Sequence, residues 1–143
     1  MRAKSLTPEP NPAPGFAERP DKSITIEPHP GTVTVTAEGL LLASTTAALS
    51  LVEDGYPPVL YIPFTDIDFR HLSRTGTQTH CPFKGDATYW QIGLPGDGGT
   101  DVMWSYETPF DEMEAIKGHG AFIADRVQVS AGDVPEPDDK ENV

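Results

Sequence analysis

The chain is poor in three features that often point to a function: cysteine, basic residues and long apolar runs. Its single cysteine among 143 residues, Cys81, excludes an internal disulfide and the paired-cysteine spacing of a structural zinc site. The 10 Lys and Arg against 22 Asp and Glu leave a net charge of −12, which opposes binding to nucleic-acid phosphates or an anionic membrane surface. No apolar run approaches the roughly 20 residues of a membrane helix, and the N-terminus lacks a signal-peptide core. We therefore expect a cytoplasmic protein with no metal, no nucleic-acid partner and no membrane partner.

Composition divides the chain into one domain and two tails. Residues 1–22 are rich in proline, residues 132–143 are acidic, and neither segment has an apolar pattern. Such segments bury too little to offset the entropy cost of ordering. The sequence predicts a disordered N-terminal segment, a single globular β-rich domain over residues 23–131 and a disordered acidic tail.

Between these ends, apolar and β-branched residues recur mainly with a period of two, which is typical of strands. The pattern predicts roughly eight short strands, with an alternating segment at residues 68–73 that a polar turn at 74–77 separates from the next strand. The clearest strands are expected at residues 24–27, 32–37, 59–63, 87–94 and 101–106. The loop at 95–100 joins two strands, so we interpret it as a hairpin and not as a phosphate cradle.

Two short helices complete the predicted pattern. Thr45 can cap a helix that ends before Gly55, since glycine suits the left-handed position after a helix. Residues 108–118 carry a proline near their start, acidic residues in the first turn and Lys117 in the last. The sum predicts an α+β fold dominated by antiparallel pairing.

The motif THCPFKGDATYW at residues 79–90 resembles the small bacterial proteins of domain-of-unknown-function family 427, with the pattern T-x-C-P-x-K-G-x-A-x-Y-W. The segments LVEDGYPPVLYIP before it and WSYETPFDEMEAIKGHGAFIADRVQV after it extend the resemblance over residues 32–131. The resemblance implies a compact antiparallel sheet of a tent-like or barrel-like kind. Zinc-binding relatives of such folds use paired cysteines, so the resemblance does not carry zinc to this chain. Phe64 stands where family members commonly have a basic residue.

A nucleotidyltransferase label that is attached to the family has no support in these residues. Neither a paired-carboxylate metal site nor a phosphate-binding loop is evident in the sequence. No cofactor is therefore expected.

Two neighbouring residues are the catalytic candidates. Cys81 follows His80 and precedes Lys84 by three residues, and a nearby cation stabilises the reactive thiolate. The alternative is that Cys81 is a small buried hydrophobe, because neighbours on a strand point to opposite faces.

Lys84 and Gly85 place a cation and a permissive backbone at a tight turn, where an anion could bind. Lys117 is a second candidate for the same pocket, although it also suits a helix C-terminus. The alternative is that Gly85 supplies only a positive φ and that water solvates Lys84.

Four aromatic residues lie on the two strands of the predicted hairpin: Tyr89, Trp90, Trp104 and Tyr106. Trp104 and Tyr106 share a face, and one of Tyr89 or Trp90 should lie across from them. They form either a packed core or the wall of a pocket.

Two hypotheses follow. In the first, the protein binds a small anionic ligand, with or without catalysis, between the Cys-Pro-Phe-Lys-Gly turn and these aromatic side chains. In the second, the protein is a non-catalytic interaction or structural module, in which the motif only holds the fold. A cleft that contains Lys84 and an aromatic side chain favours the first, and a filled core with a flat apolar surface favours the second.

Overall fold

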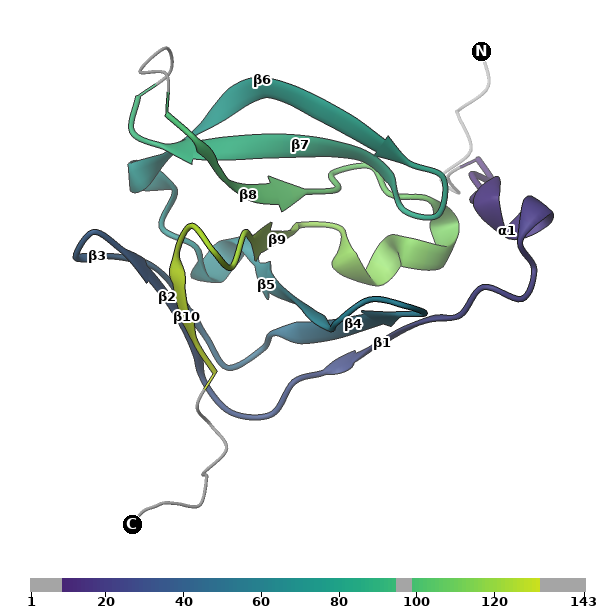
Figure 1. The fold of residues 1–143 in the computed structure, drawn as a ribbon, viewed down its shortest axis with the longest axis horizontal. Helices are drawn as coiled ribbons and strands as arrows, with labels where there is room; N and C mark the ends of the chain where they lie inside the picture. Colours follow the sequence, from purple (N-terminus) through teal and green to yellow (C-terminus); the bar gives the residue numbers. More distant parts are fainter. Residues whose placement is uncertain (1–8, 95–98, 132–143) are drawn as a thin grey trace, which may run out of the picture.

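The computed structural model describes residues 9–94 and 99–131, and its framework is a set of ten strands (Figure 1). The strands are β1 Ile24–Pro28, β2 Val33–Ala37, β3 Leu40–Thr45, β4 Leu49–Glu53, β5 Val59–Pro63, β6 Leu72–Cys81, β7 Gly85–Ile92, β8 Asp101–Ser105, β9 His119–Phe122 and β10 Gln128–Ser130. The helical segments are α1 Gly15–Glu18 and the 3₁₀-helices η1 Phe64–Asp66, η2 Phe69–His71 and η3 Asp111–Ile116. In the described ranges, no helix has the length and apolar character needed to cross a membrane.

The strands form two antiparallel sheets. The larger sheet has the order β1-β4-β5-β9-β8-β7-β6, and the smaller has the order β10-β2-β3. Figure 1 shows β6, β7 and β8 at one side of the molecule and β1 and β4 at the other, with β5 and β9 between them. The sheets do not close into a barrel. The predicted α+β class with mainly antiparallel pairing is confirmed.

The apolar residues form two clusters. One fills the space between the small sheet and the large one, and it includes the inward residues Val33 and Val35 of β2, Met103 of β8 and Trp90 of β7. The other is made of Leu51, Tyr61, Ala87, Tyr106, Met113, Ile116 and Ala121. Because side chains alternate along a strand, β5, β7, β8 and β9 each contribute to both clusters.

The prediction of a helix after Thr45 is wrong, because the segment forms strand β4. β4 pairs with β1 and β5, and it buries Leu51 while Val52 faces solvent. The Thr45 hydroxyl accepts a hydrogen bond from Ala47 N (2.9 Å), so the cap that we expected closes a turn between strands instead. Gly55 does have a positive φ of 85°, within the turn that joins β4 to β5.

The other expected helix, over residues 108–118, is a 3₁₀-helix with a kink at Met113. Met113 and Ile116 are both buried, and their spacing matches the three residues per turn of this helix type. Within the alternating segment predicted at 68–73, Phe69–His71 also form a 3₁₀-helix, and the Asp68 side chain that precedes it accepts a hydrogen bond from Arg70 N.

Strand β6 runs through the polar segment that we expected to be a turn. Its pairing with β7 is interrupted between Arg74 and Gln78, so the Thr-Gly-Thr segment is an irregularity within one strand. The predicted hairpin between β7 and β8 is confirmed by their antiparallel pairing. Part of its loop, residues 95–98, lies outside the described residues, as do residues 1–8 and the expected acidic tail at 132–143.

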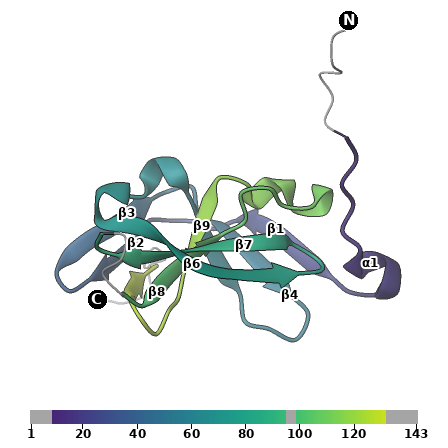
Figure 2. The same cartoon turned by 90° about the horizontal axis from the view of Figure 1, so that it is seen from above.

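Residues 9–22 contact the strands of the domain. Gly15 N donates to Pro82 O (2.9 Å), and the Phe16 ring meets the Phe83 ring edge-on at 4.9 Å. Ala13 is buried, although its neighbours are mostly proline. Seen from above, α1 lies beyond the ends of β1 and β4 (Figure 2). A few anchored side chains therefore hold a segment that has no apolar period.

Candidate functional site

A cleft of about 270 Å³ lies where the β4–β5 hairpin faces β7 and β8. Its lining consists of a few apolar residues, one ion pair and an unusual number of aromatic rings. The lining residues are Leu51, Glu53, Tyr56, Pro57, Val59, Tyr61, Lys84, Tyr89, Trp104 and Tyr106. All four tyrosines of the chain thus reach one cleft. Lys84, Tyr89, Trp104 and Tyr106, which the sequence singled out, come together here.

The turn between β6 and β7 directs Lys84 into the molecule. Lys84 N donates to Cys81 O, and Lys84 O accepts from Phe110 N. Gly85 has a φ of 125°, and a Cβ there would lie 3.3 Å from the Cα of Pro109. Only glycine fits this backbone without strain. Lys84 is only 8% exposed, so it is not a solvated turn residue.

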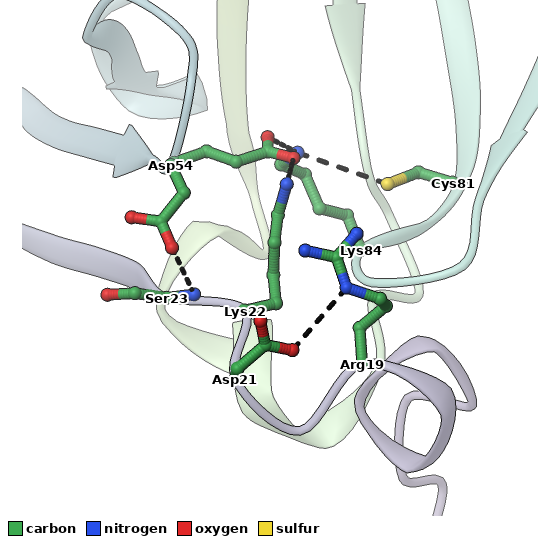
Figure 3. Close-up of polar contacts among 8 residues, drawn as sticks. Arg19, Asp21, Lys22, Ser23, Asp54, Cys81 and Lys84 are labelled. Atoms are coloured by element: carbon green, nitrogen blue, oxygen red, sulfur yellow. Dashed lines mark hydrogen bonds and ion pairs between the residues drawn. The ribbon is translucent and has the colours of Figure 1, made fainter.

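Two ammonium groups share one carboxylate beside the cleft. Lys84 Nζ lies 2.6 Å from Glu53 Oε1, and Lys22 Nζ lies 3.0 Å from Glu53 Oε2. Figure 3 shows Lys22 and Lys84 approaching from two different segments of the chain. Burial raises the pKa of Glu53, but the hydrogen bonds and charges of Lys84 and Lys22 outweigh it and hold this pKa below its usual value. The cluster therefore carries one excess positive charge in a strongly acidic protein.

Lys22 comes from the N-terminal segment that precedes β1. Its Nζ lies 5.3 Å from the centre of the Tyr56 ring and 5.2 Å from the centre of the Phe83 ring. These cation–π contacts and the Glu53 carboxylate fix the ammonium group in place. The N-terminal segment is thus part of the site's electrostatics.

The hydroxyls of two largely buried tyrosines, Tyr61 and Tyr106, differ in their bonding. Tyr61 OH accepts a bond from Trp104 Nε1 (3.2 Å), which leaves its own proton available. The Tyr106 side chain is only 7% exposed, and within residues 9–94 and 99–131 its hydroxyl has no hydrogen-bond partner, but the hydroxyl oxygen is not fully buried and opens onto the cleft. Burial raises the pKa of both phenols well above the ordinary value of 10. Both groups therefore stay protonated at neutral pH and are neutral hydrogen-bond donors.

The two catalytic candidates, Cys81 and His80, are adjacent in sequence, but their side chains have different surroundings and different partners. Cys81 is half-buried, and its Sγ lies 3.9 Å from Lys84 Nζ. His80 is exposed, and its Nδ1 lies 2.7 Å from Asp86 Oδ1. Across the part of the chain that the structure describes, no hydrogen bond joins the His80 ring to the Cys81 sulfur. Neighbouring residues on a strand face opposite sides, which explains the separation.

Two other candidates lie away from the cleft. Trp90 is in the core between the sheets, and its Nε1 donates to Ser105 Oγ (3.1 Å). Lys117 follows η3 and does not line the cleft. Among the described residues, no group of three His, Cys, Asp or Glu side chains is placed to hold a metal ion.

The sequence reasoning missed Glu53, Tyr61 and Lys22. Glu53 had been assigned to a helix, and as the last residue of β4 it faces Lys84 instead. The signal for Tyr61 was its position in the clear strand at 59–63, since a buried phenol needs a hydrogen-bond partner. Lys22 carried no local signal, because only the tertiary fold brings it to Glu53.

Comparison with known proteins adds the family. No curated protein matches the chain. The family described as "Domain of unknown function (DUF427)" matches residues 25–133. That range contains every residue of the cleft and all of the ten strands apart from Ile24, the first residue of β1, whereas Lys22 lies just before it. The chain belongs to this family, and the resemblance to it that the sequence indicated is confirmed.

Proposed function

We propose that the cleft beside Lys84 binds a small molecule with an anionic, oxygen-rich group. The observation that carries this proposal is the lining of the cleft, in which the Lys84 ammonium group and the Tyr106 hydroxyl lie among aromatic rings. The Tyr106 hydroxyl donates to no group in the described parts of the chain, so its proton is available to a ligand oxygen. A charged acceptor would strengthen that hydrogen bond.

The donors around the cleft favour an anion over a neutral or cationic group. Lys84, Tyr61 and Tyr106 all have N–H or O–H protons to donate, and the raised pKa of each phenol keeps it from becoming an acceptor anion. The Glu53 carboxylate opposes an anion, but two ammonium groups surround it. The balance of charge therefore favours one added negative charge.

The aromatic side chains favour a ligand that also has a flat or apolar part. Tyr89 and Trp104 are direct partners across the β7–β8 ladder, so their rings share one face of the sheet. Small-molecule sites are mostly apolar, with a few polar groups that orient the ligand, and this cleft has that composition.

Binding has more support here than catalysis. A thiolate mechanism at Cys81 needs a general base within hydrogen-bond reach, and the ring of His80 is paired with Asp86 instead. The competing hypothesis is a structural or interaction module in which the Lys84–Glu53 pair only holds the fold, and the experiment below separates the two.

The experiment compares thermal shifts of the parent with those of Tyr106→Phe, using phosphate, nucleotides and carboxylates at millimolar concentration. Without a ligand, Tyr106→Phe should melt close to the parent, because the hydroxyl makes no hydrogen bond within the described residues that the variant would lose. With the ligand, it should bind about tenfold more weakly, which corresponds to roughly 1.4 kcal/mol. Thr34→Val, which removes a hydroxyl on β2 outside the cleft, is the control and should bind as the parent does.

Lys84→Met provides the second arm. It should lose most of the stabilisation that the ligand gives the parent. If no tested anion stabilises the parent, or if Tyr106→Phe and Lys84→Met respond to the ligand as the parent does, the binding proposal fails. The structural hypothesis would then stand.

A further inference from the structure

A second cleft, of about 340 Å³, adjoins the first and is lined by apolar side chains and proline rings. The lining residues are Val35, Pro57, Pro58, Val59, Leu60, Ile62, Trp104, Phe122, Ile123, Ala124 and Val129. None of these residues is charged, in contrast to the Lys84–Glu53 pair of the first cleft. This apolar groove has no role in the function proposed above.

The pairing of β5 explains why the groove exists. β5 pairs with β9 only at Ile62 and Pro63, opposite Gly120 and His119. Within residues 9–94 and 99–131, the start of β5 therefore has no paired strand on the β9 side. Leu60 and Phe122 line the space that results.

The two clefts meet at three shared residues: Pro57, Val59 and Trp104 line both. Along β5 the lining alternates, because Tyr61 faces the first cleft while Leu60 and Ile62 face the groove. The hydrogen bond from Trp104 Nε1 to Tyr61 OH fixes the indole at this junction. A continuous surface thus leads from Lys84 and Tyr106 past Trp104 to carbon-lined walls.

We propose that the ligand is an amphipathic anion, a linear alkyl carboxylate or a close chemical relative, whose tail lies in the apolar groove. This inference rests on the proposed function, since it places the anionic group on Lys84 and Tyr106. The tail passes Val59 and Trp104 and ends against Phe122 and Val129. Each cleft alone is near or below the lower limit of roughly 300 Å³ for small-molecule sites, whereas the two together are well within the range.

The chemistry of the groove favours this occupant over the chain's own acidic end. Residues 132–143 read GDVPEPDDKENV, in which charged side chains and prolines dominate. Burying those charges against carbon-lined walls would be costly without partners. An alkyl chain loses no hydrogen bond on entering, and its burial is favourable in proportion to the area removed from water.

The test is isothermal titration of the full chain with sodium hexanoate, octanoate and decanoate below their micelle concentrations. Affinity should rise two- to fourfold for each added methylene, where fourfold corresponds to about 0.8 kcal/mol. Octanol and octyltrimethylammonium should bind at least tenfold more weakly than octanoate, because neither brings a negative charge to balance the excess positive charge of Lys22, Glu53 and Lys84.

Two exposed valines provide matched variants. Val129 lines the groove and is 40% exposed, whereas Val52 on β4 lines neither cleft and is 43% exposed. Val129→Glu should abolish the dependence on chain length and leave the binding of short anions unchanged. Val52→Glu should behave as the parent does.

The outcomes distinguish this inference from the proposed function. Anion binding that needs Lys84 but does not change with chain length, or that is limited to phosphates, overturns the inference and leaves the function in place. Chain-length dependence that survives Val129→Glu also overturns it, because the tail then lies elsewhere. If octanol binds as tightly as octanoate, the site recognises no anion, and both proposals fail for this ligand class.

Discussion

The two tryptophans lie on neighbouring strands of one hairpin but have different surroundings. Trp90 pairs across the ladder with Met103 in the core between the sheets, and the rings of Phe64 and Phe69 and the guanidinium of Arg74 contact it. Trp104, on the opposite face, lines both clefts. Both indole N–H groups donate to a hydroxyl oxygen, so hydrogen bonding does not distinguish the two tryptophans. The difference is packing, which closes one face of the hairpin and leaves the other open to a ligand.

Alanine at each tryptophan gives the largest expected contrast. Trp90→Ala removes a ring that is enclosed on several sides, so it should lower the free energy of unfolding by roughly 3–5 kcal/mol. The Trp104 ring borders open clefts, so Trp104→Ala should lower the free energy of unfolding by only about 1–3 kcal/mol. It should nevertheless abolish anion binding. Urea denaturation and thermal shift with ligand measure the two effects. Equal destabilisation by the two variants would contradict the distinction between a closed and an open face.

Truncation of the N-terminal segment tests whether stability and anion binding depend on residues that precede the range matched by the family. Deleting residues 1–22 removes the Phe16–Phe83 contact, the buried Ala13 and the Lys22–Glu53 pair. We expect a loss of about 2–3 kcal/mol in unfolding free energy and weaker anion binding, because Glu53 would retain only Lys84. Deleting residues 1–8 is the control. A shortened chain that melts and binds as the parent does would show that the segment is dispensable.

The pH dependence of stability provides a test with a smaller expected effect. The folded pKa of Glu53 is depressed, so its contribution to stability is present above the unfolded value of about 4.3 and is lost as the pH falls through the folded value. Hydrogen bonds from Arg70 likewise lower the pKa of Asp68 to about 2, on the exposed side of η2. Stability should therefore fall between pH 5 and pH 3 less steeply in Glu53→Gln than in the parent.

Asp68→Asn should change the pH dependence only below about pH 4, and by less, because water screens an exposed pair. Denaturation midpoints at several pH values measure both slopes. A slope in Glu53→Gln equal to that of the parent would show that the Lys84–Glu53–Lys22 cluster does not contribute to stability.

Strand alternation predicted the parts of the site that depend on local pattern. Either Tyr89 or Trp90 was expected to lie across from Trp104, and the register shows that Tyr89 does. Prediction failed where one pattern fits two structures, since the Ala- and Leu-rich run after Thr45 suits a helix as well as the observed strand. That error displaced Glu53, the partner of Lys84.

Long-range contacts were outside the reach of sequence patterns. Lys22 lies in a proline-rich segment. Its position depends on contacts with the Phe83 ring and with Glu53 at the end of β4, which are distant in the sequence. The apolar groove has the same origin, because it depends on how far the pairing of β5 with β9 extends. The alternation of apolar and polar residues along β5 and β9 does not determine how far their pairing extends.

The most direct test of the account follows the two indole N–H signals by ¹H–¹⁵N NMR, while sodium phosphate, benzoate or octanoate is added. The chain has two tryptophans, so each signal can be assigned with Trp90→Phe and Trp104→Phe. The account predicts a saturable shift of the Trp104 signal with at least one of these anions, while the Trp90 signal stays in place. The Trp104 shift should be weakened in Tyr106→Phe. A Trp104 signal that does not move with any of them, or a Trp90 signal that moves instead, would contradict a ligand site on the open face.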